Sequence, residues 1–155
     1  PNKYNVGICW QGSEISIDQG RSFALHEFAK ISKIKNINLV SLQKNIGVEQ
    51  ILDFKKNYSI LDFGEELDKK VSFLDTAGVI KNLDLVITAD TAIAHLAGSM
   101  GAKVWLLLSY MPIWTWLLNT NKTKWYPSMK LFRQTRPDDW KSVFKDIENE
   151  LKTNP

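Results

Sequence analysis

Residues 83–101, LDLVITADTAIAHLAGSMG, decide how the chain is interpreted. The apolar run at 85–88 predicts a buried strand that leads directly into a helix over 91–100. Asp90 stands at the junction and is a favoured N-cap residue. The unpaired N–H groups and the positive dipole end of such a helix point into the space above the carboxyl end of the strand. The junction therefore predicts an anion site, and phosphate is its usual occupant.

Three further residues of this stretch suit such a site. Thr91 and His95 lie four positions apart, so both side chains can face one spot on a helix. Ala92 lacks the bulk that would block a ligand. The alternative is a capped helix behind a core strand, with His95 merely packed, and spacing alone does not separate the two interpretations.

Strand and helix patterns alternate along the rest of the chain. Further strands are predicted over 6–11, 39–42, 60–63, 102–108 and 129–132, and further helices over 23–31 (with Ser22 as N-cap), 48–56, 72–83 and 140–151. The inward face of the helix over 72–83 is expected to hold Phe73, Leu74, Ala77, Val79 and Ile80. This alternation predicts an α/β fold, a doubly wound, Rossmann-like parallel sheet with helices on both faces.

Composition limits the class of protein. The 155 residues, 44% of them hydrophobic, suit one domain with its own core. A net charge of +3 without a long basic run gives no reason to expect a nucleic-acid partner. The single cysteine, Cys9, lies in an apolar run and is expected to be buried. We see no signal peptide and no membrane-spanning stretch, and the entry into a strand almost at residue 1 leads us to expect a domain excised from a longer chain.

Polar groups that suit a phosphate follow other predicted strands as well. Ser13 and Arg21 follow the first strand, and Gln43 and Lys44 follow the second. Because doubly wound folds bind ligands at the carboxyl edge of the sheet, these residues are expected to converge on the helix junction. The plainer interpretations are a simple turn for Gly12 and Ser13, and a solvated charge for Arg21 or Lys44. For Gln43 the alternative is a bond to the backbone.

Other conspicuous residues and missing motifs narrow the choice further. His26 is expected to pack or to face solvent, and core or edge packing is expected for Trp114, Trp116, Trp125 and Trp140. The sequence contains no G-x-G-x-x-G fingerprint, P-loop, Cys/His cluster or serine elbow. These absences argue against a dinucleotide cofactor, a P-loop nucleotide site, a metal site and a serine hydrolase.

The order of these motifs resembles a known family. The runs VGICWQGS, GRSF, LVSLQK, FLDTAGVIKNLDLVITADTAIAHLAG and VWLLL look like the C-terminal domain of bacterial glycosyltransferases of the heptosyltransferase-like type. The D-T-A-x-x-H core at 90–95 is the most specific part. The runs W-x-W, WYP and LFRQ, at 114–116, 125–127 and 131–134, are closer to a subgroup in which this domain follows tetratricopeptide repeats. The resemblance covers nearly the whole chain, and a more distant likeness is to the O-linked N-acetylglucosamine transferases.

The resemblance implies a role for each candidate residue of the junction. This half of the enzyme would bind a nucleotide-diphosphate sugar, the donor substrate. Thr91 and Ala92 would contact its diphosphate through a hydroxyl and a backbone N–H, and His95 would support the phosphates. Asp90 would hold a sugar hydroxyl or only cap the helix.

The same resemblance assigns the candidates on the other loops. Ser13 and Arg21 would supply the phosphate-binding hydroxyl and cation that follow the first strand. Gln43 and Lys44 would lie near the ribose or the phosphates. The wall around the base would come from Phe73, Leu74 and Ala77.

The activity implied is transfer of a sugar to an acceptor hydroxyl, without a metal or other cofactor, by two facing Rossmann-like halves (the GT-B architecture). The general base would come from the N-terminal half, so no catalytic residue is expected in this chain. The chain alone should bind a nucleoside diphosphate weakly and transfer no sugar. The implied partners are the donor, the missing N-terminal acceptor domain and tetratricopeptide repeats. The implied location is the cytoplasm, or the periphery of the inner membrane for the full-length protein.

Two other classes stay open. One is a catalytically inactive binding or interaction module of a tetratricopeptide-repeat protein. The other is an unrelated doubly wound enzyme such as a sugar-nucleotide epimerase, against which the missing glycine fingerprint argues.

Overall fold

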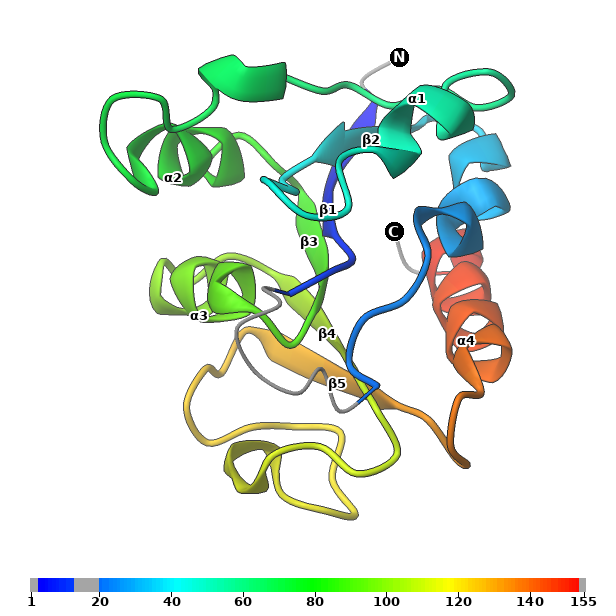
Figure 1. The fold of residues 1–155 in the computed structure, drawn as a ribbon. Helices are drawn as coiled ribbons and strands as arrows, with labels where there is room; N and C mark the ends of the chain where they lie inside the picture. The colour runs from blue at the N-terminus through cyan, green and yellow to red at the C-terminus, as the bar shows by residue number, and fades with distance from the viewer. Residues whose placement is uncertain (1–2, 13–19, 154–155) are drawn as a thin grey trace.

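Short apolar runs form the strands of a single parallel sheet in the computed structural model, which describes residues 3–12 and 20–153 (Figure 1). The strands are β1 (Tyr4–Cys9), β2 (Ile37–Ser41), β3 (Leu85–Ala89), β4 (Val104–Leu108) and β5 (Met129–Arg133). Their order across the sheet is β2-β1-β3-β4-β5, and every neighbouring pair is parallel. The strand order reverses direction between β1 and β3, which is the topological switch point of a doubly wound sheet. The predicted fold class is confirmed.

Side chains alternate between two layers of core because successive residues of a strand face opposite ways. In β4, Trp105 and Leu107 point into one layer, and Val104, Leu106 and Leu108 point into the other. The first layer is covered by the 3-10 turns η1 (Leu25–Ala29) and η2 (Ile31–Lys33) and by helices α1 (Gln50–Phe54) and α4 (Trp140–Thr153). The second is covered by α2 (Leu74–Ile80) and α3 (Ala92–Ser99). Two further turns are η3 (Gly64–Glu66) and η4 (Trp114–Trp116).

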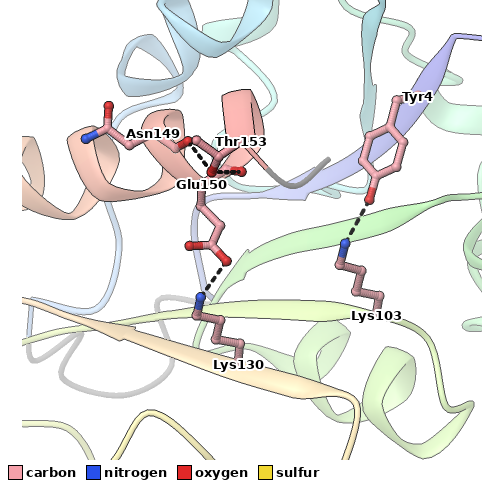
Figure 2. A network of polar contacts seen from close by, with 6 residues as sticks. All are labelled: Tyr4, Lys103, Lys130, Asn149, Glu150 and Thr153. Atoms are coloured by element: carbon pink, nitrogen blue, oxygen red, sulfur yellow. Dashed lines mark hydrogen bonds and ion pairs between the residues drawn. The ribbon is translucent and has the colours of Figure 1, made fainter.

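Polar contacts tie the rim of the sheet to its neighbours (Figure 2). Lys130 Nζ on β5 lies 2.7 Å from Glu150 Oε1 on α4. Lys103 Nζ, just before β4, donates to the hydroxyl of Tyr4 on β1 at 3.2 Å. Such partly exposed contacts contribute at most about 1 kcal/mol each, so the two apolar layers carry the stability of the fold.

The strand predicted over 60–63 is wrong. This segment runs beside β2 but forms only a single bridge, between Val40 and Leu61. Gly64 then adopts a left-handed φ of 59°, and its N–H donates to Asp62 Oδ1 at 3.2 Å. This tight turn directs the chain away from β2, so the pairing ends before a second bridge forms.

The helix predicted over 23–31 is also wrong in type. The buried apolar face is present, but the backbone forms the 3-10 turns η1 and η2. Ser22 does not cap them; its Oγ accepts a hydrogen bond from the N–H of Gly12 at 3.2 Å. The N–H of Leu25, at the start of η1, donates instead to Gln50 Oε1 at 2.9 Å, a partner from α1.

The other helices begin later or end earlier than predicted, except α4, whose predicted apolar face is buried as expected. Ile80 of α2 is buried, but Leu74 and the preceding residue, Phe73, are exposed, so the predicted inward orientation of these two is wrong. The tryptophans divide in the same way. Trp116 and Trp140 are buried as predicted, whereas Trp114 and Trp125 are exposed. His26 is exposed and its ring meets the edge of Tyr58, as expected.

Candidate functional site

A cavity of about 520 Å³ opens at the carboxyl edge of the sheet, at the switch point between β1 and β3. Its walls come from the loops that follow β1 and β2, the first residues of α3, and Phe73 before α2. Arg21, Gln43, Lys44, Thr91 and Ala92 all line it, so the structure brings five predicted site residues together. The described residues of the lining include two cations and no carboxylate, so the described part of the walls is electropositive.

The first turn of α3 is capped by Thr91, and the prediction that Asp90 is the N-cap is wrong. Thr91 is the last extended residue (φ −137°, ψ 173°), and its Oγ1 accepts from the N–H of Ile93 at 3.3 Å. Its backbone carbonyl accepts from the N–H of Ala94 at 3.0 Å. Asp90 lies one residue too early to cap and is buried outside the cavity lining. The exposed Ala92 leaves the helix N-terminus open to a ligand.

Gln43 holds the loops of the cavity together with its side-chain amide. Its Oε1 accepts from the N–H groups of Trp10 at 2.9 Å and Gln11 at 3.0 Å, and from the thiol of Cys9 at 3.3 Å. Its Nε2 donates to the carbonyls of Gln11 and Ile46, each at 2.8 Å. Both amide hydrogens are therefore used by backbone, as the plainer interpretation of Gln43 has it, and this residue shapes the site.

The guanidinium of Arg21 lies directly against the backbone of Gly12. A Cβ at position 12 would sit 2.8 Å from Arg21 Nη2, closer than non-bonded atoms approach. The missing side chain of Gly12 leaves room for this cation beside the cavity, and a side chain at position 12 would require the guanidinium to shift. Ser13, the other residue predicted in this loop, lies outside the described residues.

Lys44 reaches across the cavity rim to the loop that precedes α2. Its Nζ donates to the carbonyl of Leu67 at 2.5 Å. The next residue, Asp68, accepts from the N–H of Asp75 at 2.8 Å and from the N–H of Thr76 at 3.0 Å, both with Oδ1. Its Oδ2 accepts from the Thr76 hydroxyl. Asp68 is thus the cap of α2, a residue that sequence reasoning missed because it stands seven positions before the first N–H that it caps.

The pKa of Asp68 reflects this role. Burial by itself would raise the pKa of the carboxyl group, but the hydrogen bonds from Thr76 and Asp75 and the charge of Lys44 outweigh it and lower the pKa below its usual value. The ionised carboxylate is therefore the form that holds the start of α2, next to the cavity.

Phe73 sits between this cap and the cavity in a left-handed conformation, with φ of 64°. Such a backbone is costly for a bulky side chain and marks a site that the surroundings hold in place. Phe73 is among the residues that line the cavity. Leu74 and Ala77 lie outside the lining, so the structure does not bring them to the same wall.

His95 does not line the cavity, although it stands one turn after Thr91. Its ring stacks on Trp116, with centroids 5.3 Å apart, and its Nδ1 lies 3.0 Å from the hydroxyl of Tyr126. Tyr126 fits there because Gly98 has no side chain; a Cβ at Gly98 would approach the ring to 2.6 Å. The geometry therefore matches the plainer interpretation of His95, as a packed residue of α3.

Cys9 closes the floor of the cavity and is buried, as predicted. Its Sγ lies 3.3 Å from Gln43 Oε1 and 3.6 Å from Thr91 Oγ1. Burial raises the pKa of the Cys9 thiol, and the hydrogen bonds from Thr91 and Thr88 only partly offset it. The sulfur therefore stays protonated at neutral pH and donates to the amide that fastens the loops.

A second hollow of about 720 Å³ is lined by residues of β1, β2 and α2 and by the segment 61–67 between them. Its described lining is mostly apolar, with Leu61, Phe63 and Leu74, and its charged groups are Glu66 and Asp75. Although it is larger, this hollow repels an anion, so the cavity at the switch point is the better candidate for a phosphate ligand.

Among residues 3–12 and 20–153, no three His, Cys, Asp or Glu side chains come together as a metal site would require. Within the same ranges, none of the helices combines the length and the apolar character needed to cross a bilayer.

Comparison with known proteins gives a distant relative. The chain is 26% identical over 149 residues to protein FlbA of Caulobacter vibrioides, a match that covers 95% of the chain. The chain spans about a quarter of the length of FlbA (25%). No family model matches the sequence, and no solved structure matches the fold significantly.

Proposed function

We propose that this chain is the donor-binding half of a glycosyltransferase of the heptosyltransferase-like type and holds a nucleotide-diphosphate sugar in the switch-point cavity. The observation that carries the proposal is the lining of that cavity. Arg21 and Lys44 come from two separate loops and meet the open N-terminus of α3 at Ala92, with no carboxylate among the described lining residues. This combination is what a diphosphate requires.

Each group of the cavity has a physical reason to act on the diphosphate. A guanidinium can donate two parallel hydrogen bonds to phosphate oxygens, and a lysine acts as a compact charge. The unpaired N–H groups at the start of α3 add donors and the positive end of the helix dipole. Phe73 offers an aromatic face at the rim, suited to a nucleobase.

The chemistry follows from which bond breaks. In sugar transfer the acceptor oxygen bonds to the anomeric carbon while the bond from that carbon to the diphosphate oxygen breaks, so negative charge grows on the leaving diphosphate. Arg21, Lys44 and the start of α3 would stabilise that charge. The base that takes the proton of the acceptor would lie on another part of the protein, which agrees with a chain that spans a quarter of its longer relative.

Isothermal titration calorimetry of the chain with UDP, ADP and GDP tests the donor site. We expect one of the three to bind, and we expect Arg21→Ala to weaken that nucleotide about tenfold, because a charge-assisted hydrogen bond contributes roughly 1.5–3 kcal/mol. The matched control is Lys70→Ala, which removes an exposed cation outside the cavity lining and should change nothing. Absence of heat with all three nucleotides contradicts the proposal and favours an interaction module.

A second assay separates binding from transfer. The chain alone, incubated with the matching sugar nucleotide and simple hydroxyl acceptors, should release no nucleoside diphosphate. Turnover by this chain would show that a catalytic base lies within it, which the proposal denies.

A further inference from the structure

An exposed apolar surface lies on the loop that follows β4, away from the cavity lining. We call it the tryptophan surface; it consists of Met111, Ile113, Trp114, Leu117, Leu118 and Trp125. Trp114 is 80% exposed, Met111 71% and Trp125 58%. Tryptophan is seldom left this open on a protein that has no partner at that place, so the surface indicates an interaction site.

The loop that carries this surface is fixed by specific contacts. Arg133 Nη2 donates to the carbonyl of Leu117 at 2.7 Å, and Trp125 Nε1 donates to the carbonyl of Thr115 at 3.2 Å. Between the exposed residues, Trp116 is buried against His95 of α3. Hydrogen bonds and the buried Trp116 therefore hold this loop in place. The exposure of the tryptophan surface does not come from a frayed loop.

The charged side chains around the tryptophan surface are all positive in sequence. Residues 91–137 contain no Asp or Glu. Lys122 and Lys124 are exposed on the same loop, next to Trp125. Two other cations of the stretch already have carboxylate partners, Lys130 with Glu150 and Arg136 with Asp139. Lys122 and Lys124 are therefore exposed positive charges on the loop that carries the tryptophan surface.

We propose that the tryptophan surface docks on an anionic lipid bilayer. Indole rings favour the interfacial zone between headgroups and acyl chains, while lysines beside them contact anionic headgroups. Leu117 and Leu118 add acyl-chain contact, so apolar and electrostatic terms act together. A second copy of the chain would oppose like charge to like charge, and protein interfaces are depleted of lysine at their cores. The inference does not depend on the proposed donor site.

Vesicle flotation tests the proposal, with vesicles of phosphatidylcholine alone and of phosphatidylcholine mixed equally with phosphatidylglycerol. We expect the chain to bind the mixed vesicles and not to bind the vesicles of phosphatidylcholine alone. Trp114→Ser and the double variant K122E/K124E should each lower the partition coefficient about tenfold. Acyl-chain-brominated lipid should quench the tryptophan emission of the wild type and quench Trp114→Ser less.

Matched controls separate the surface from bulk properties. Leu52→Ser removes an equally exposed apolar residue (77%) from α1, and K35E/K70E makes the same change of charge elsewhere; both should bind like the wild type. Circular dichroism checks that every variant is folded. The proposal is overturned if mixed vesicles do not bind, if K35E/K70E weakens binding as much as K122E/K124E, or if Trp114→Ser binds and is quenched like the wild type. It is equally overturned if the chain self-associates through Trp114 in sedimentation.

Discussion

Two helices on the same face of the sheet, α2 and α3, begin at the cavity, and their N-termini are held in different ways. The start of α3 is capped by the residue directly before it, Thr91, in relaxed extended geometry. The start of α2 is capped from outside the helix by Asp68, and its own N-cap position holds Phe73 in a left-handed conformation. The start of α3 is set by the strand β3 that leads into it, whereas the start of α2 is set by the loop that precedes it.

Because of this difference, one wall of the cavity is fixed by the sheet, whereas the other depends on contacts within a loop. The N–H groups of α3 are fixed by β3 behind them, which suits a site that must meet phosphate oxygens at one geometry. Phe73 stands on a loop held by Asp68 and Lys44, so the aromatic wall depends on polar contacts that are partly exposed. We therefore expect mutations at the start of α2 to affect stability more strongly and in more varied ways than mutations at the start of α3.

The largest effect is expected for Asp68→Ala. The variant loses the cap on the N–H groups of Asp75 and Thr76 and leaves the buried Thr76 hydroxyl without its acceptor. We expect a loss of about 2 kcal/mol in the free energy of unfolding, measured by urea denaturation at pH 7. Asp53→Ala, which removes an exposed i,i+3 ion pair from α1, should cost less than about 0.5 kcal/mol. Equal losses in the two variants would show that Asp68 is not the cap of α2.

Thr91→Val gives the matching test on α3. Valine keeps the shape but cannot accept from the N–H of Ile93, so the helix loses its local cap. We expect a loss of about 1 kcal/mol by urea denaturation, half of the effect at Asp68. Thr91→Ser, which keeps the hydroxyl, should stay near the wild type. If Thr91→Val lowered the free energy of unfolding as much as Asp68→Ala, the starts of α2 and α3 would not differ in their sensitivity to mutation, contrary to our expectation.

The same contrast explains how much the sequence predicts. The junction at 83–101 was predictable because strand, cap and helix are adjacent, and the predicted cap, Asp90, is one residue away from the observed cap, Thr91. The sheet was predictable from its apolar runs for the same local reason. The start of α2, the 3-10 turns of η1 and the bonds of Gln43 all depend on partners distant in sequence, such as Asp68 and Gln50. No local pattern encodes those pairings.

Of the candidate site, the sequence predicted the edge of the sheet and five residues that line the cavity. It left open whether Gln43 bonds to the backbone or to a ligand, and whether His95 packs or faces the site; the structure shows the amide of Gln43 bonded to the backbone and the ring of His95 stacked on Trp116. The reason is that residue type and strand position fix where a side chain begins, whereas its direction depends on neighbours contributed by other loops.

A smaller effect is expected for Phe73→Gly, which separates stability from the proposed binding. Glycine adopts a φ of 64° without strain but loses the ring and gains freedom when unfolded, so stability should rise by only about 0.5 kcal/mol. Affinity for the nucleotide that binds in calorimetry should fall, because the ring lines the cavity. Phe73→Leu keeps the strain and loses the ring, so it should lose affinity without the gain in stability. Unchanged affinity in both variants would exclude Phe73 from the binding wall.

The smallest effect is expected in the pH dependence of stability, and it is specific to α2. Because the folded pKa of Asp68 lies below its usual value of about 3.9, the unfolded chain binds more protons between the two values. The stabilisation from this group is therefore complete above the usual value and is lost as the pH falls through the folded pKa. Asp68→Asn accepts the same backbone N–H groups without ionising, so the stability difference between wild type and Asp68→Asn should shrink on acidification, measured by urea denaturation between neutral and acidic pH. Thr91→Ser, with no titrating group at its cap, should keep a constant difference from the wild type across the same range, and a difference that shrinks equally in both variants would mean that the acid response does not come from the α2 cap.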